Sequence, residues 1–188
     1  MFAQETHECK NIVGVSPFSF GYSLTIKYER QLNGKITCGG FGTWYYFFDP
    51  GVQFAPMARY YFWENAPKGF YAQAKIMGGY YSRDNVIYIY DQPHESRLQN
   101  LIATEHRKQP YTSFGAGIAV GYQFVWGKDN RWSIDVNAGR NWTNGYPPNP
   151  ILKDNEELSL GSAITNYVFF LCGAGIIVDG LLSIGYRF

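Results

Sequence analysis

The sequence lacks a large excess of charge of either sign. Its 188 residues include 16 Lys and Arg against 15 Asp and Glu, and no block of like charges stands out. Nucleic-acid-binding domains carry clustered basic side chains, so this balance gives no reason to expect nucleic acid as a partner. The length is that of one domain, and a second domain is not expected.

Long hydrophobic runs are also missing. A membrane-spanning helix needs ~18 apolar residues, whereas the longest candidate, YVFFLCGAGIIV at 167–178, is shorter and contains two glycines. A helical membrane protein is therefore excluded. The N-terminus, MFAQETHECK, has no basic or apolar region of a signal peptide, yet its third and fourth residues resemble a cleavage site. We expect a nearly mature chain whose leader is absent.

Metal and redox motifs are scarce. The three cysteines, at positions 9, 38 and 172, form neither a CxxC pair nor a dense disulfide framework, and we interpret them as structurally incidental. The three histidines, His7, His94 and His106, show no ligand spacing. No metal site and no cofactor is predicted.

Aromatic residues and glycine are abundant. The chain has 16 Tyr, 14 Phe, 5 Trp and 21 Gly, while charged residues make up only 16% of it, against roughly 25% in ordinary soluble domains. Aromatic side chains suit pleated surfaces, and glycine in strands marks bends or close backbone approach. The composition favours a β protein.

Large apolar side chains recur at every second residue. In SFGAGIAVGYQFVW, at 113–126, the even positions are bulky and the odd ones mostly small or polar, which is typical of a strand with one apolar face. The same test predicts eight strands, near 11–18, 24–29, 36–46, 52–62, 70–81, 113–126, 132–139 and 182–188. Short turns, QLNG, ENAPKG and GKDNR, alternate with longer connections near 82–112 and 143–165. We therefore divide the chain into an N-terminal segment, 1–10, and a barrel, 11–188.

Charged residues in the strands fall on the face opposite the large apolar side chains. They are Lys27, Glu29, Arg59, Lys75, Asp135 and Arg187. The interior of an eight-stranded barrel holds little more than its own side chains, so rings from every strand would not fit there. The apolar face must then point outward, toward lipid. The prediction is an all-β fold: an eight-stranded antiparallel transmembrane β-barrel with a polar interior.

The aromatic positions give a second test of this orientation. They gather at the two ends of the strands, with Ile, Val, Leu, Ala and Gly between them, as expected for rings at two membrane interfaces. The members of these girdles include Tyr28, Tyr60, Trp126 and Trp132 at the short-turn end, and Trp44 and Trp142 at the other end.

The strand pattern, the turns and the terminal IGYRF resemble the small outer-membrane barrels of Gram-negative bacteria, the class of OmpX and the membrane domain of OmpA. More narrowly, YERQLNGKITCGG, FAPMARYYF and IGYRF resemble an uncharacterised barrel family of Bacteroidota. The resemblance implies an outer-membrane location, periplasmic termini and a periplasmic N-terminal segment. It further implies insertion by the barrel-assembly machinery, with Ile184, Tyr186 and Phe188 as the C-terminal signal.

The interior charges are the first candidate site. Buried charges need partners, so we expect Glu29 and Asp135 to pair with some of the four cations. The pattern leaves two interpretations open, a structural polar core and a narrow conduction path.

A second candidate lies in PHESRLQNLIATEHRK. His94 and Ser96 are two residues apart and Glu105 follows, which resembles the hydrolase arrangement of lipid A deacylases. Pro93 and the polar surroundings favour a solvated loop, so the chain is not predicted to be an enzyme.

Two further features concern binding. NVIYIY, at 85–90, either extends the fifth strand beyond the membrane or offers an edge to a partner strand. Arg140 is expected to face lipid, where it contacts a lipopolysaccharide phosphate or reaches water. The expected partners are outer-membrane lipid and lipopolysaccharide, with other outer-membrane or periplasmic proteins. The expected function is a non-enzymatic scaffold or accessory subunit of an envelope complex; the alternatives are a lipid A-modifying enzyme and a small pore.

Overall fold

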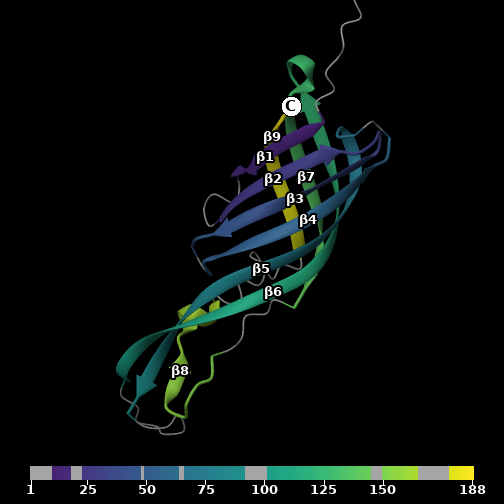
Figure 1. The fold of residues 1–188 in the computed structure, drawn as a ribbon. Coiled ribbons are helices and arrows are strands. Elements are labelled where there is room, and N and C mark those ends of the chain that lie inside the picture. The colour runs from purple at the N-terminus through teal and green to yellow at the C-terminus, as the bar shows by residue number, and fades with distance from the viewer. Residues whose placement is uncertain are drawn as a thin grey trace, which may run out of the picture.

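Eight antiparallel strands close into a ring (Figure 1). The computed structural model describes residues 10–17, 23–47, 49–63, 66–91, 101–144, 150–164 and 178–188. The ring consists of β1 (Asn11–Ser16), β2 (Ser23–Gln31), β3 (Ile36–Tyr45), β4 (Gly51–Tyr61), β5 (Gly69–Tyr90), β6 (Leu101–Trp126), β7 (Trp132–Thr143) and β9 (Val178–Arg187). The predicted fold is confirmed, because each expected strand is present and β1 pairs with β9.

The start of β1 and the end of β9 meet at the seam of the ring. The backbone N–H of Asn11 donates to the carbonyl of Phe188 at 3.1 Å, and the N–H of Phe188 donates to the carbonyl of Asn11 at 3.0 Å. The expected short turns lie at this same end. The turn between β6 and β7 contains the 3-10 helix η2 (Lys128–Asn130) and starts at Gly127, whose φ of 87° favours glycine.

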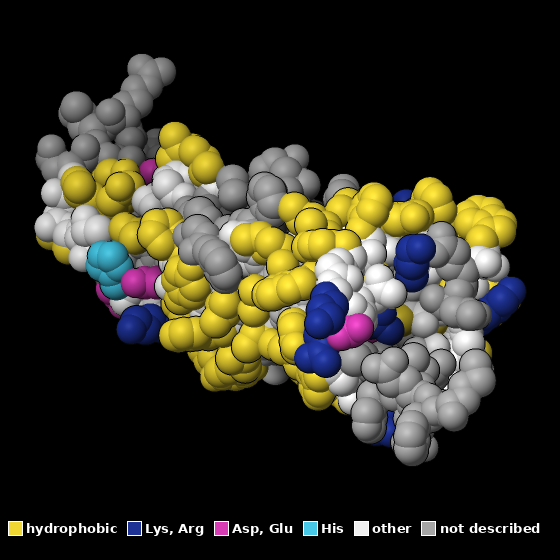
Figure 2. Space-filling model, turned by 90° about the horizontal axis from the view of Figure 1, so that it is seen from above, with side chains coloured by type: hydrophobic (Ala, Val, Ile, Leu, Met, Phe, Trp, Pro, Cys, Tyr) yellow, Lys and Arg dark blue, Asp and Glu magenta, His cyan; other side chains and the backbone are white. Residues whose placement is uncertain are grey.

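Side chains on the strands alternate between lumen and exterior. On β7, Ser133 and Asp135 are buried in the lumen, while Trp132, Val136 and Trp142 are exposed on the outside. Trp132 and Trp142 are ten residues apart, which is ~33 Å along a strand and about 25 Å across a bilayer at the usual tilt. That matches the apolar band of a membrane barrel. Hydrophobic side chains cover much of the visible face in Figure 2.

The structure holds no long apolar helix: in the described parts of the chain, none could cross a membrane.

β5 and β6 continue far beyond the ring. The connection expected as a long loop near 82–112 is, in its described part, a two-stranded extension that pairs Ser82 with Pro110 and Tyr90 with Leu101. A short strand, β8 (Glu156–Leu158), pairs with β5 at Ile87–Ile89 outside the ring (Figure 1). The second expected loop, near 143–165, thus supplies a strand, followed by a helical turn at 160–164. We call β5 from Ser82, β6 up to Pro110, and β8 the projecting sheet.

Three layers of side chains fill the lumen. Along β4, from the short-turn end, Tyr61 and Arg59 come first, then Met57 and Ala55, then Gln53. β5 runs in the opposite direction and, from the same end, places Tyr71 first, then Met77, and then Tyr81 and Arg83. The middle layer, formed by Phe41, Ala55, Met57 and Met77 with Leu181 packed against it, is apolar. The interior therefore has ionic groups at both ends and an apolar cluster between them, with Lys75 and Asn141 on the lumen wall beside that cluster.

Candidate functional site

Four charged side chains meet in the lumen near the short-turn end. Lys27 Nζ lies 3.1 Å from Glu29 Oε2 and 2.8 Å from Asp135 Oδ2. Arg59 completes the ring of charges, with Nη1 2.9 Å from Glu29 Oε2 and Nη2 2.8 Å from Asp135 Oδ2. The side chains are at most 1% exposed, and two positive charges balance two negative ones. We call this group the lower ionic layer; Figure 1 draws its end of the barrel, with the short turns, at the top.

Neutral side chains satisfy the remaining atoms of these carboxylates and of the guanidinium. Tyr61 and Thr37 donate hydrogen bonds to Glu29 Oε1, and Tyr71 donates to Asp135 Oδ1. Arg59 also donates to Gln73 and Gln123, and its guanidinium carbon lies 4.2 Å from the centre of the Tyr71 ring. Charges buried away from water are stable only with such partners. The layer has the partners that a structural polar core requires.

One glycine makes room for the Tyr71 ring. A Cβ at Gly121, on the neighbouring strand β6, would lie 2.5 Å from the hydroxyl oxygen of Tyr71 and 2.6 Å from the carbonyl oxygen of Val136. Neither distance is tolerable, so the ring can reach Asp135 only because position 121 carries no side chain.

Two of the six predicted interior charges lie elsewhere. Lys75 faces the lumen but sits toward the apolar layer, with its Nζ 5.8 Å from the centre of the Phe41 ring. Arg187 lies at the end of β9, where it donates to the carbonyl of Asn130 in the β6–β7 turn. The structure thus brings Glu29 and Asp135 together with Lys27 and Arg59, and places the other two cations outside this group.

A second ionic group lies at the opposite end of the lumen. Arg83 Nη2 is 2.6 Å from Asp49 Oδ2, with both side chains 2% exposed. Tyr111 donates to the same oxygen at 2.9 Å, and the Tyr111 ring stacks on Tyr81, which packs against Tyr45. We call this group the upper ionic layer. The pair of Asp49 and Arg83 in this layer joins the β3–β4 connection to the first residues of the projecting sheet.

Sequence reasoning missed the tyrosines of both layers. The signal was present, because aromatic residues occur in adjacent pairs: Trp44–Tyr45, Tyr60–Tyr61, Phe70–Tyr71 and Tyr80–Tyr81. Adjacent residues of a strand point to opposite faces. Each pair must therefore place one ring in lipid and one in the lumen, where a hydroxyl group makes tyrosine suitable.

The hydrolase-like residues are only partly within the described chain. His94 and Ser96 lie outside the described residues. Glu105 is on β6 in the projecting sheet, 47% exposed, with Oε2 3.1 Å from Arg107 Nη2. The neighbouring His106 Nδ1 lies 3.2 Å from Asp84. The one acid of the motif that is described is thus an exposed partner of an arginine.

The projecting sheet contains a third ionic group. Arg107 donates to Glu156 Oε1 and Oε2, each at 3.3 Å, and to the carbonyl of Ile151 at 3.1 Å. These bonds from Arg107, with the backbone N–H of Lys153, hold the pKa of the Glu156 carboxyl below its ordinary value of 4.5. The pair links β8 to β6 across β5. NVIYIY therefore extends the fifth strand, and at Ile87–Ile89 β6 and β8 occupy both of its edges.

Metal ligands do not cluster: in the described ranges, no three His, Cys, Asp or Glu side chains are placed to hold a metal ion. Cys38 is a free, half-buried thiol on β3, while Cys9 and Cys172 lie outside the described residues.

The predicted exterior residues all face outward. Tyr28, Tyr60, Trp126 and Trp132 are exposed at the short-turn end, and Trp44 and Trp142 at the other. The side chains of Ile184, Tyr186 and Phe188 are exposed along β9. Arg140 is exposed on β7, with its guanidinium carbon 5.6 Å from the centre of the Trp142 ring.

A closed ring of eight strands, an apolar exterior with two aromatic girdles and a filled lumen define a transmembrane β-barrel. Residues 44–149, more than half of the chain, match the family described as "Protein of unknown function (DUF3575)", and the chain belongs to that family. No curated protein matches it. Among solved structures, the chain is similar to the N-terminal β-barrel domain of Pseudomonas aeruginosa OprF, at 11% identity. That alignment covers 95% of this chain and 96% of that one, with a TM-score of 0.43.

Proposed function

We propose that this protein is a non-enzymatic barrel of the bacterial outer membrane, similar to barrels of Bacteroidota. In this proposal it serves as a scaffold or accessory subunit of an envelope complex, its termini are periplasmic and the barrel-assembly machinery inserts it. Its activity is binding, and its contact element is the projecting sheet.

The observation that carries the proposal is the contrast between a filled lumen and a long extension. The apolar layer of Phe41, Ala55, Met57 and Met77 lies between the two ionic layers, and the charges of each layer pair with one another, which favours a structural core over a conduction path. Tyr80 is exposed at the level of Trp44, in the girdle far from the short turns, and β5 continues to Tyr90, ~33 Å farther along the strand. In this proposal the extension, and not the lumen, is the surface that contacts other molecules.

The composition of the extension fits a binding surface. Leu101 and Ile102 on β6 and Ile151 near β8 expose more than half of their side-chain surface, and charged residues of the same sheet, such as Asp84 and Lys108, are also exposed. Exposed apolar side chains with a polar rim are typical of protein contacts.

The test compares the complete protein with a variant in which residues 84–108 are replaced by a two-residue turn. Both are purified from native membranes in mild detergent, and co-purifying proteins are identified by mass spectrometry. We expect a partner in constant ratio to the wild-type barrel and its loss from the shortened variant, at equal barrel levels. A Lys128→Glu variant, altered in the short turn at the opposite end, is the matched control.

Other outcomes would reject the proposal. The same proteins recovered with both barrels, or none with either, would show that the extension is not the contact element. Stable stepwise conductance of the purified protein in planar bilayers would favour the pore. Hydrolysis of lipid A that is lost in Ser96→Ala would favour the enzyme.

A further inference from the structure

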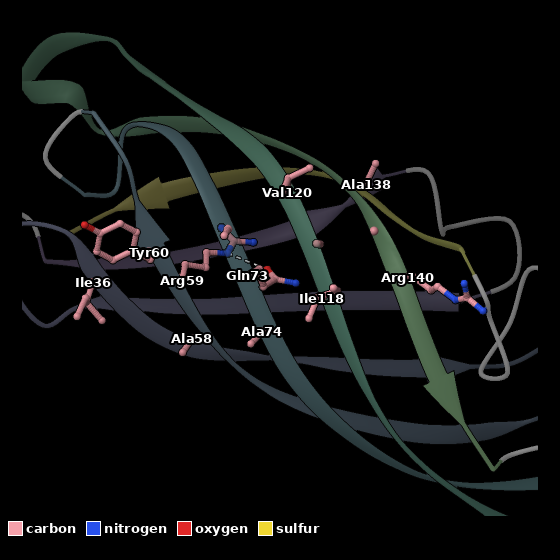
Figure 3. Close-up of a pocket in the computed structure, with 13 residues that line it drawn as sticks. Ile36, Ala58, Arg59, Tyr60, Gln73, Ala74, Ile118, Val120, Ala138 and Arg140 are labelled. Atoms are coloured by element: carbon pink, nitrogen blue, oxygen red, sulfur yellow. Dashed lines mark hydrogen bonds between the residues drawn. The ribbon is translucent and has the colours of Figure 1, made fainter.

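A groove crosses the outer wall of the barrel from β3 to β7. Its volume is about 780 Å³, within the range of ~300–1,000 Å³ that is usual for ligand sites. The groove exists because alanines meet in register: Ala58 opposite Ala74, and Ala138 opposite Val120, which is itself opposite Ala72. Figure 3 shows Tyr60 and Ile36 at one end of this groove and Arg140 at the other.

A second groove joins the first. Its volume is about 450 Å³, and it shares Ala58, Ala74 and Ile118 with the first groove before reaching Trp142. The two apolar grooves therefore meet on the outer wall of the barrel, beside Arg140 and Trp142.

Arg140 is the charged side chain that this surface presents outward; Arg59 and Lys75 also line the grooves, but their side chains face the lumen. Among the described charged side chains of the barrel strands, Arg140 is the one that points outward between the two girdles; Arg30 also points outward, but it lies beyond Tyr28 at the short-turn end. A cation on the lipid face is unfavourable unless an anion or water reaches it. An anion inside the lipid layer would satisfy this charge and leave the apolar grooves beside it in an apolar environment.

The chemistry of the site selects its occupant. A second copy of this barrel would present the same wall, which in its described part holds no carboxylate between the girdles to pair with Arg140. A membrane lipid supplies both an anion for Arg140 and apolar groups for the grooves, since its phosphate pairs with a guanidinium and its acyl chains fill the grooves. We propose that Arg140 and the two grooves form a binding site for a membrane lipid that carries a phosphate and at least two acyl chains.

This site is independent of the projecting sheet, so its test can fail without affecting the proposed function. The complete protein in detergent is mixed with phosphatidylglycerol, lipid A, diacylglycerol or inorganic phosphate, and bound molecules are counted by native mass spectrometry. We expect retention of at least one of the two phosphate-bearing lipids in preference to diacylglycerol, and no retention of inorganic phosphate. Preference between phosphatidylglycerol and lipid A identifies the natural class.

Two variants with matched controls assign the binding to these residues. Arg140→Gln should lower retention of the phosphate-bearing lipid about fivefold, the factor that corresponds to one surface cation, and leave diacylglycerol unchanged. Arg30→Gln should have no effect. Ala74→Phe fills both grooves and should reduce retention of every acylated probe, whereas Gly42→Phe, where a Cβ meets open space outside the grooves, should not.

The proposal is wrong if Arg140→Gln and Arg30→Gln reduce retention equally, or if diacylglycerol binds as well as the phosphate-bearing lipids. It is also wrong if the barrel forms dimers that Ala74→Phe disrupts, because a second copy would then occupy the grooves.

Discussion

The lower ionic layer and the ionic group of the projecting sheet use the same residue types in opposite surroundings. In the lumen, Arg59 is fully buried and donates to Glu29, Asp135, Gln73 and Gln123. In the projecting sheet, Arg107 is 33% exposed; its partner Glu105 is 47% exposed, and its partner Glu156 is 3% exposed but lies outside the ring. Buried ion pairs are costly to break, whereas exposed ones contribute little. The difference separates residues that hold the barrel together from residues that shape a surface.

β6 shows this change within one strand. From Ser113 to Trp126 its apolar and small residues alternate, but residues 104–109 read TEHRKQ and carry polar side chains on both faces. Charges on both faces of a strand, with a proline at 110, disfavour pairing with strands of other molecules. These residues therefore reduce the tendency of the projecting sheet to aggregate in water.

The largest expected effect is in the lower ionic layer. Asp135→Ala leaves Lys27 and Arg59 with Glu29 as their one shared carboxylate. Because an uncompensated buried charge remains, we expect the free energy of unfolding to fall by about 3–5 kcal/mol. The measurement is urea unfolding of the refolded protein in lipid vesicles, followed by tryptophan fluorescence.

A double variant provides the control. Lys27→Met combined with Asp135→Leu removes one charge of each sign and leaves Arg59 paired with Glu29. It should be clearly more stable than Asp135→Ala. If Asp135→Ala unfolds like the wild type, the lumen is hydrated well enough to solvate its charges, and the contrast with the projecting sheet disappears.

The next effect concerns the end of the chain. Phe188→Ala keeps both backbone hydrogen bonds to Asn11, and its ring is 55% exposed. We expect the free energy of unfolding of the refolded barrel to fall by only about 1 kcal/mol, while the amount of barrel assembled in cells falls several-fold. Heat-modifiable migration on gels measures assembly. Equal losses in both measurements would leave no role for the ring as an assembly signal.

A smaller effect is expected in the projecting sheet. Arg107→Gln removes ion pairs that lie outside the ring and involve a one-third exposed guanidinium, so the free energy of unfolding of the barrel should change by less than about 1 kcal/mol. Hydrogen exchange should nevertheless become faster at the amides of β8, because Arg107 links Glu156 to β6. Lys108→Gln, on the neighbouring exposed position, is the control. Faster exchange throughout the lumen would contradict the separation of the two regions.

The smallest effect is a pH dependence confined to β8. A carboxyl whose pKa is lowered by folding stabilises the folded form above its ordinary pKa, and this contribution is lost as pH falls through the lowered value. Docking of β8 should therefore weaken as pH falls below about 4.5, the ordinary value for Glu156. NMR shifts of residues 156–158 in micelles, between pH 7 and 3, measure this. Glu156→Gln should remove the transition, and its persistence in that variant would assign it to another group.

The sequence predicted most of the ring and only half of the lumen. Period-two alternation fixes which face each side chain occupies, so the outward positions of Trp44 or Trp132 and the inward position of Asp135 follow directly. The alternation does not give the register of one strand relative to strands across the barrel. Contacts such as Arg59 with Asp135, from β4 and β7 across the barrel, depend on that register and could not be read from spacing.

The long connections were harder to predict for another reason. Residues 104–109 are polar on both faces and carry no period, so they were expected to form a loop, yet β5 holds them in register beyond the membrane. Asp49 was missed because it lies in the connection between β3 and β4. Side chains in a connection do not alternate between two faces, so the sequence does not indicate which way they point.

The apolar layer of Phe41, Ala55, Met57 and Met77 has one more consequence. It lies between the upper ionic layer and the lower one, and each layer is neutral by itself, with one cation and one carboxylate in the upper layer and two of each in the lower. Replacing the charges of one layer as a set would therefore leave the charge balance of the other unchanged.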